Sequence, residues 1–272
     1  MAYPPAGSDH LVATTSRALI RHATAAAAGD PAGVHALRRR LRQLRVLLTL
    51  LAPPLPTDQR RRLLVAFKAL ADAAGPVRDC DVLAAAVVRY QDHLPPRLRR
   101  HLRAVHALLA ANRRTAVITL QTLLDSAGYH DLCDDLTRLG PRALVATELW
   151  PLARKLRRAA RRALRRPTTR RLHRLRIRTK MLRYALDAVD QPTHRRLRRR
   201  LKRLEELLGK HHDSTNQVVW MHAGTGQLPT TSTEAAGALA VLFARRARRL
   251  ARRIRAAALP LTRSGCWRCV RS

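Results

Sequence analysis

The sequence predicts an all-α fold made of two similar helical bundles, and three observations support this. Hydrophobic residues make up 46% of the 272 residues but aromatic residues only 3%, and the dominance of alanine and leucine favours helices over strands. Leucines and cations recur at helical spacing along most of the chain. One pattern of cations also occurs twice, which indicates an internal repeat whose halves are related by a pseudo-twofold axis.

Helix-capping and helix-breaking residues divide the first half into segments. Asp30-Pro31 is typical of a helix start, and Pro53-Pro54 of the end of the same helix. Thr57-Asp58 starts the next helix, and Gly75-Pro76 is interpreted as its end. The predicted helices of this half span residues 8–28, 31–52, 57–74, 77–94 and 97–126.

The second half repeats these signals after a predicted break over residues 128–141. Pro167-Thr168-Thr169 precedes a helix, Gln191-Pro192-Thr193 separates it from the following one, and Gly209 is interpreted as the end of that one. The predicted helices span residues 142–165, 169–189, 193–208, 211–222 and 234–258.

These boundaries predict one domain over residues 8–258, with halves 8–127 and 142–258 and with tails 1–7 and 259–272. Cys266 and Cys269 form a CxxC pair in the second tail, but no second cysteine pair accompanies it, so a frayed terminus is expected. The amino terminus does not resemble a signal peptide, and no apolar stretch approaches about 18 residues. A cytoplasmic protein is therefore expected, with no membrane as partner.

Two cationic stripes are the main candidate for function. The first stripe is His35, Arg38, Arg42 and Arg45, and the second is His173, Arg176, Lys180 and Arg183. Offsets of 0, 3, 7 and 10 residues fall within about 80° on a helix, so each set shares one face and extends roughly 15 Å. The opposite face is mainly leucine. A line of positive charge on an anchored helix suits a linear polyanion.

The repeat extends beyond the stripes at a period of about 138 residues. Lys68 and Lys202 each lie eleven residues before the acidic residue of a second shared element, GPVRDCD at 75–81 and GKHHDST at 209–215. Arg61 and Arg195 each lie seven residues before their lysine, on the same helical face. These four cations are therefore further candidates for the binding surface.

Net charge limits the classes of partner. Lys and Arg total 54 against 18 Asp and Glu, a formal net charge of +36, so the expected partner is nucleic acid, an inorganic phosphate polymer or an acidic membrane. Few aromatic residues are available to stack on bases, which argues against nucleic acid. The apolar helix faces resemble core rather than exposed membrane-binding faces, which argues against an acidic membrane. A helical nucleic-acid-binding protein remains the alternative.

No catalytic or metal site is expected. The chain has four Glu and no phosphate-binding P-loop, so the carboxylate cluster or glycine-rich loop of phosphoryl-transfer enzymes is missing. Adjacent His211, His212 and Asp213 point to different sides of a helix, which argues against a metal site there. Asp79 and Asp213 are expected to orient arginines or to cap the following helix. No cofactor is expected.

Four segments in order resemble the CHAD domain family, the conserved-histidine α-helical domain: VHALRRRLRQLR, GPVRDCDVL, LHRLRIRTKMLRYAL and LGKHHDSTN. The resemblance covers roughly residues 8–258. It implies a pair of helical bundles and binding of inorganic polyphosphate in a basic groove or pore between the halves. We expect a non-enzymatic polyphosphate-binding protein, with polyphosphate granules as a location and nucleic acid only as a nonspecific competitor. By resemblance, the binding positions are both stripes together with Lys68, Arg78 and Lys202. His212 stands where the family more often has an uncharged polar residue.

Overall fold

The computed structural model describes residues 10–52, 55–139, 143–144 and 149–270. Helices dominate this part of the chain, which confirms the all-α prediction. Its strands are one antiparallel pair of two residues each, β1 (Leu51–Ala52) and β2 (Ala143–Leu144). The long helices are α1 (Leu11–Ala27), α2 (Pro31–Leu47), α3 (Thr57–Tyr90), α5 (Leu102–Leu124), α6 (Ala127–Arg138), α7 (Leu149–Arg165), α8 (Thr169–Val189), α9 (Arg195–Ala223) and α10 (Thr230–Ala258). No helix among the described residues is long and apolar enough to cross a membrane.

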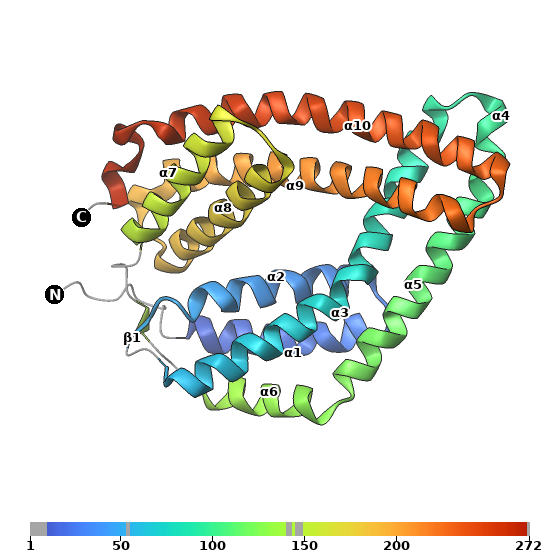
Figure 1. The fold of residues 1–272 in the computed structure, drawn as a ribbon. Coiled ribbons are helices and arrows are strands. Elements are labelled where there is room, and N and C mark those ends of the chain that lie inside the picture. The colour runs from blue at the N-terminus through green and yellow to red at the C-terminus, as the bar shows by residue number, and fades with distance from the viewer. Residues whose placement is uncertain (1–9, 53–54, 140–142, 145–148, 271–272) are drawn as a thin grey trace.

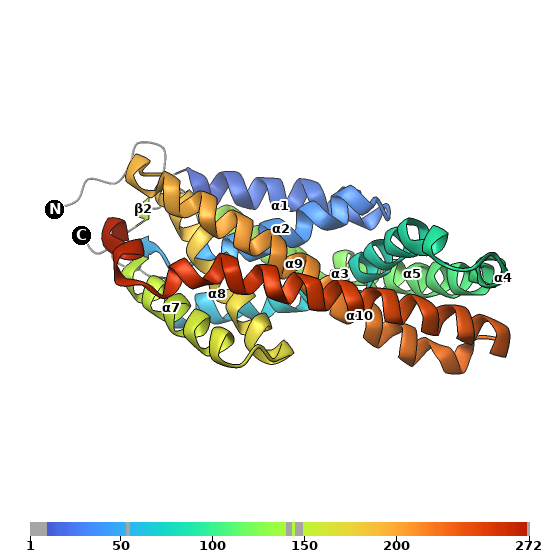
Figure 2. The ribbon, with the colours of Figure 1, turned by 90° about the horizontal axis from the view of Figure 1, so that it is seen from above.

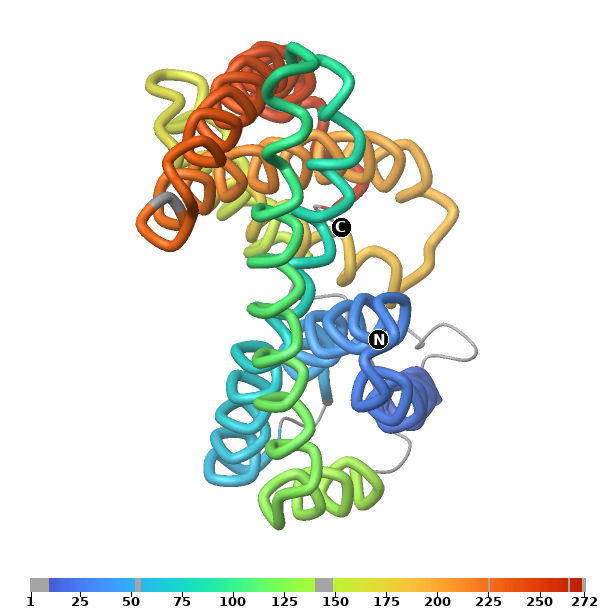
Figure 3. The backbone as a smooth tube through the Cα atoms, turned by 90° about the vertical axis from the view of Figure 1, so that its right-hand side faces the viewer, coloured from blue at the N-terminus to red at the C-terminus, as the bar shows by residue number. Residues whose placement is uncertain are grey.

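The helices form two layers that are joined at one end. In Figure 1, α1, α2, α6 and the first part of α3 form the lower layer, and α7 to α10 form the upper one. Seen from above, α10 runs along the upper layer (Figure 2). Figure 3 shows α3 and α5 rising together from the lower layer to the upper one. Across the space between the layers, α2 contacts α8 and α3 contacts α9.

The predicted starts of both striped helices are confirmed by their capping bonds. The Asp30 carboxylate accepts hydrogen bonds from the backbone N–H groups of Ala32 and Gly33, with Pro31 at the first helical position. The Thr168 hydroxyl accepts from the N–H of Arg171 at 3.3 Å. Such bonds satisfy N–H groups that have no partner within the helix, so each helix starts at a defined residue.

Two predicted helix ends are wrong, because α3 continues through Gly75-Pro76 and α9 continues through Gly209. Pro76 removes one helical hydrogen bond, a local cost that burial on both sides of it offsets. Before Pro76, Leu63 and Phe67 are buried in the main core. After Pro76, residues of α3 are buried in a second core. The two parts of one helix are therefore anchored in different places.

The predicted break over residues 128–141 is also wrong for its described part. It contains most of α6, which starts after Ser126, whose hydroxyl accepts from the N–H of Tyr129 at 3.3 Å. Leu132 and Leu136, one turn apart, bury one face of this helix. The first striped helix, expected to reach residue 52, ends at Leu47 before the short strand β1.

The expectation of a frayed carboxyl terminus is wrong for residues 259–270. Two 3₁₀ turns, Leu259–Thr262 and Ser264–Val270, pack against the domain. Trp267 is completely buried, and its indole N–H donates to the carbonyl of Leu261 at 3.1 Å. The predicted amino-terminal tail, 1–7, lies outside the described residues.

A second core links the two layers at their joined end. It is formed by residues of α3, α5, α9 and α10 and of the short helix α4 (Pro96–Arg99), and its largest member is the fully buried Phe243. This core holds the later part of α3 against α9. The space between α2, α3, α8 and α9 is therefore bounded by helices with buried anchors. The pseudo-twofold relation of the two halves stays a prediction.

Candidate anion-binding site

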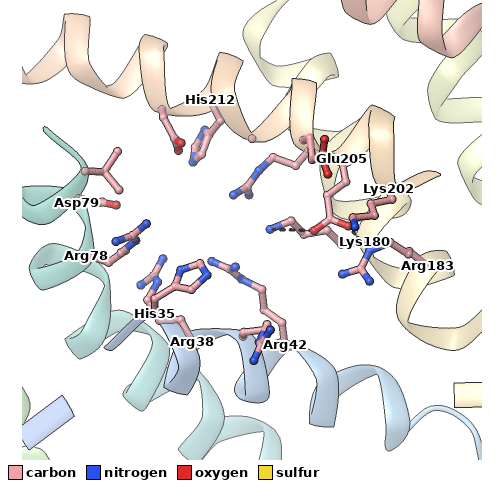
Figure 4. A pocket seen from close by; sticks show the side chains of 16 residues that line it. His35, Arg38, Arg42, Arg78, Asp79, Lys180, Arg183, Lys202, Glu205 and His212 are labelled. Carbon is pink, nitrogen blue, oxygen red and sulfur yellow. Dashed lines mark hydrogen bonds and ion pairs between the residues drawn. The ribbon is translucent and has the colours of Figure 1, made fainter. Parts of the chain in front are cut away.

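A cavity of about 450 Å³ lies where α2, α3, α8 and α9 face one another (Figure 4). Eight Arg and Lys side chains line it against four Asp and Glu, so the cavity carries a surplus of positive charge. Its charged and histidine residues are His35, Arg38, Arg39, Arg42, Arg78, Asp79, Arg176, Lys180, Arg183, Lys202, Glu205, Glu206, His212 and Asp213.

The structure brings together eight of the thirteen residues that were predicted as candidates. These are His35, Arg38 and Arg42 from α2, Arg78 from α3, Arg176, Lys180 and Arg183 from α8, and Lys202 from α9. Their positions in the sequence span 168 residues, from 35 to 202, and the fold places them around one space. Stripe periodicity had predicted that the cations of each helix share a face, and the contact of α2 with α8 turns both faces toward the cavity.

Five candidates do not line this cavity: Arg45, Arg61, Lys68, His173 and Arg195. All five are exposed. The side chain of Lys68 is 73% exposed and pairs with Asp72 at 2.6 Å, so Lys68 and Lys202 take different places. His173 lies at the edge, its ring centroid 5.2 Å from that of His212.

Arg38 is a half-buried cation on the α2 side. Its Nη1 donates to the carbonyl of Ala71 at 3.1 Å, which ties α2 to the turn of α3 that precedes Pro76. Burial, with the nearby Arg42, lowers the pKa of Arg38 to about 10. Burial also lowers the pKa of His35, and Arg78 adds to this effect. The positively charged forms of Arg38 and His35, on the α2 side of the cavity, are therefore in an unfavourable environment.

Lys180 and Arg176 are cations in a similarly unfavourable environment on the α8 side of the cavity. Burial, then the charges of Arg42 and Arg176, lower the pKa of Lys180 to about 7, although Glu205 lies 3.8 Å from its Nζ. Burial and Arg42 also lower the pKa of Arg176. The Nε of Arg176 is buried and has no hydrogen-bond partner among the described residues. An anion in the cavity would supply the missing acceptor.

Arg183 differs from these cations because two carboxylates already neutralise it. Its Nε pairs with Glu205, and its Nη1 donates to Asp187 at 2.5 Å. Its guanidinium also lies over the ring of Tyr184, 4.4 Å from the centroid. Arg183 is therefore held in place, and Glu205 pairs with both Arg183 and Lys180.

Two carboxyl groups and one imidazole line the cavity toward the second core. Burial raises the pKa of Asp79 and of Asp213 although several arginines lie near them. Both residues lie inside continuous helices, so the expectation that they cap a following helix is wrong. Burial, followed by Arg176, lowers the pKa of His212 to about 4. The imidazole is therefore neutral at pH 7 in the empty cavity.

Sequence reasoning missed Arg39, Glu205 and Glu206, and left His212 open. Glu205 follows Lys202 by three residues on α9, a spacing that places both side chains on the same face of the helix. The sequence signal that could have identified Glu205 and Glu206 is that these two adjacent acidic residues lie within an arginine-rich run. Among the described residues, no group of three or more His, Cys, Asp or Glu is placed to hold a metal ion.

The family model of the CHAD domain matches residues 11–222, a range that includes every residue lining the cavity. The chain belongs to the CHAD domain family. Solved structures with this fold include the following two. The CHAD domain from the plant Ricinus communis is 23% identical, with a TM-score of 0.72, and the match covers 92% of this chain and 89% of that chain. PptA from Streptomyces chartreusis is 17% identical, with a TM-score of 0.66, and the match covers 92% and 98%. No curated protein sequence matches this CHAD chain.

Proposed function

We propose that this CHAD protein binds inorganic polyphosphate in the cavity between α2, α3, α8 and α9, without catalysing a reaction. The observation that carries the proposal is the convergence of eight Arg and Lys side chains on one cavity with only four acidic ones. The family resemblance, which implies polyphosphate as ligand, supports the same assignment.

Chemistry of the cavity favours a chain of phosphates. Guanidinium groups donate short, charge-assisted hydrogen bonds to phosphate oxygens, often two at a time. Arg42, Arg78 and Arg176 come from three different helices, so successive phosphates along one chain could each meet a cation. Binding would release counterions and weaken steeply with salt.

Absence of catalysis is part of the proposal. Glu205 pairs with Lys180 and Arg183, and burial raises the pKa of Asp79 and of Asp213. Among the described residues, no cluster of carboxylates is placed to bind the Mg²⁺ that phosphoryl-transfer enzymes use. Incubation with polyphosphate is expected to release no orthophosphate above a protein-free control.

A helical nucleic-acid-binding protein is the second candidate, and the exposed arginines of α7 and α10 favour it. Exposed cations attract any polyanion weakly, whereas a duplex about 20 Å wide could not enter a cavity of about 450 Å³. Long-chain polyphosphate is expected to outcompete duplex DNA by at least about tenfold at roughly 0.15 M salt, where exposed contacts are strongly screened. Equal competition would favour nucleic acid as the ligand.

Arg42 and Arg45 provide a matched test of the cavity. Both belong to the first stripe on α2, but Arg42 lines the cavity and Arg45 is exposed outside it. Arg42→Gln is expected to weaken polyphosphate binding by about tenfold or more, since a hydrogen bond from a charged group contributes about 1.5–3 kcal/mol. Arg45→Gln is expected to change the affinity less than about twofold.

Isothermal titration calorimetry at a fixed salt concentration measures both variants. Each variant removes one positive charge, so a purely long-range attraction would weaken equally in the two. Equal losses would place binding on the outer surface and contradict the cavity assignment. We also propose cytoplasmic polyphosphate granules as the location of the protein, and a fluorescent fusion of the full chain would test this.

A further inference from the structure

A second cavity, of about 310 Å³, lies beside the cationic one between α3 and α9. Val82, Leu83, Val219 and Trp220 give it mostly apolar walls. Asp79, Val82 and Asp213 line both cavities, so the two spaces meet at these residues. We call this second space the side pocket.

Gln217 lines the side pocket and carries an unsatisfied acceptor. The residue is only 4% exposed, and its Oε1 is buried without a hydrogen-bond partner among the described residues. A buried acceptor without a donor is unfavourable by about 1–3 kcal/mol. The side pocket therefore suits a ligand with an apolar face and an N–H donor.

The chemistry along the two cavities changes in a fixed order. First comes the apolar side pocket with the Gln217 acceptor, then the two carboxyl groups of Asp79 and Asp213, and then the cations. A nucleoside 5′-polyphosphate has the complementary order: a flat base with N–H donors, a ribose with hydroxyl donors, and anionic phosphates. Carboxyl oxygens accept hydrogen bonds from ribose hydroxyls in other nucleotide sites.

We propose that the side pocket is a nucleoside subsite, so that the protein also binds nucleoside 5′-polyphosphates with the base beside Gln217 and Trp220. This inference rests on the proposed function, because the phosphates would occupy the same cationic cavity. Inorganic polyphosphate cannot use the side pocket in this way, since phosphates would lie between two carboxyl groups and apolar walls. A volume of about 310 Å³ is at the lower end of the usual size of small-molecule sites.

ATP and tripolyphosphate form a matched pair of probes. Both have three linked phosphates, and tripolyphosphate carries at least as much negative charge, so electrostatic attraction alone favours tripolyphosphate. Calorimetry of the full chain at equal ionic strength and without divalent cations is expected to show ATP binding about tenfold more tightly, since stacking a base contributes about 1–3 kcal/mol. Gln217→Met removes the acceptor for the base and is expected to reduce this preference severalfold while leaving the tripolyphosphate affinity unchanged.

Ala223→Leu is a second variant, in case Gln217→Met does not fold. Ala223 lines the side pocket at the exposed end of α9, so a larger side chain narrows the pocket without entering a core. The preference for ATP is expected to disappear in this variant, and its persistence would overturn the nucleoside subsite. Equal or tighter binding of tripolyphosphate by the unchanged protein would also overturn it, while leaving the polyphosphate proposal intact. If long-chain polyphosphate, tripolyphosphate and ATP all fail to bind, both proposals are overturned.

Discussion

Lys180 is a residue whose charge depends on what occupies the cavity. Its side chain is only 14% exposed. It faces Arg42 from α2, Arg176 and Arg183 from its own helix, and Glu205 from α9. Burial and the arginines together lower its pKa to about 7. Bound phosphate would add negative charge and raise this pKa again.

Lys180 therefore predicts a pH dependence with a definite sign. Its pKa is lower in the folded protein than in the unfolded chain, so the unfolded chain binds more protons between pH 7 and about 10.4, and the stability of the empty protein rises with pH there. Polyphosphate binding has the opposite trend, because it takes up a proton at Lys180. Affinity is expected to fall by roughly threefold to tenfold between pH 7 and pH 9, and proton uptake appears as a dependence of the calorimetric enthalpy on the buffer.

Lys180→Arg keeps the positive charge throughout this range and is the control. This variant is expected to lose most of the proton uptake at pH 8 while still binding polyphosphate. Unchanged uptake would assign the titration to another cavity residue, with the histidines as the next groups to test.

The spacing of the stripes predicted which face of each helix lines the cavity better than how far along the helix the cavity extends. A period of 3.6 residues fixes which face a side chain shares, and this placed three members of each stripe correctly at the cavity. It cannot tell where the neighbouring helix stops covering that face. The cavity therefore includes His35 but not Arg45 on α2, and Arg183 but not His173 on α8. Glu205 escaped prediction because its role arises only when α9 meets α8.

At the scale of elements, the crossing of α1 and α2 sets where the first stripe begins. Gly33 is buried there, and a Cβ atom on it would lie 2.7 Å from the Cβ and 2.8 Å from the carbonyl carbon of Ala25. Backbone atoms cannot move aside as a flexible side chain can. The close approach therefore requires glycine and fixes α2 two residues before His35.

Gly33→Ala is expected to lower the free energy of unfolding by about 1–3 kcal/mol, because the added methyl group forces α1 and α2 apart. Gly237 is the matched control, since it lies within α10 and a Cβ there would have no described atom within 4 Å. Gly237→Ala is expected to stabilise the protein by about 0.5–1 kcal/mol. Urea-induced unfolding followed by circular dichroism measures both. A neutral Gly33→Ala would mean that the crossing can widen freely.

Element boundaries were predictable where local bonds determine them and not where tertiary packing does. Asp30 and Thr168 marked helix starts correctly, because a capping side chain bonds to its own chain two or three residues away. Gly75-Pro76 and Gly209 were misread, since side chains on both sides of each site are buried and keep the helix continuous. Trp267 was misread for the same reason. Nothing near it in the sequence indicates the pocket in the domain that buries its ring.

At the scale of the whole molecule, charge acts against stability and in favour of binding. The net charge of +36 is distributed over 272 residues, and ion pairs such as Arg113 with Asp81 at 2.7 Å neutralise only part of it. Like charges repel in the empty protein, and a bound polyanion removes this repulsion from the folded state. A ligand that stabilises only the folded state must therefore raise the melting temperature.

Salt is expected to move the melting temperatures of the empty and the bound protein in opposite directions. Between about 0.05 M and 0.5 M NaCl the screening length falls from roughly 14 Å to 4 Å, so repulsion weakens and the empty protein melts at a higher temperature. Over the same range polyphosphate affinity falls by orders of magnitude, so the stabilisation that the ligand adds shrinks. Differential scanning fluorimetry with and without polyphosphate measures both curves, which are expected to converge at high salt.

Arg45→Gln should reproduce this behaviour, whereas Arg42→Gln should reduce the ligand-induced rise at every salt concentration, because only Arg42 lines the cavity. Parallel curves for the empty and the bound protein would mean that the ligand is not held mainly by charge.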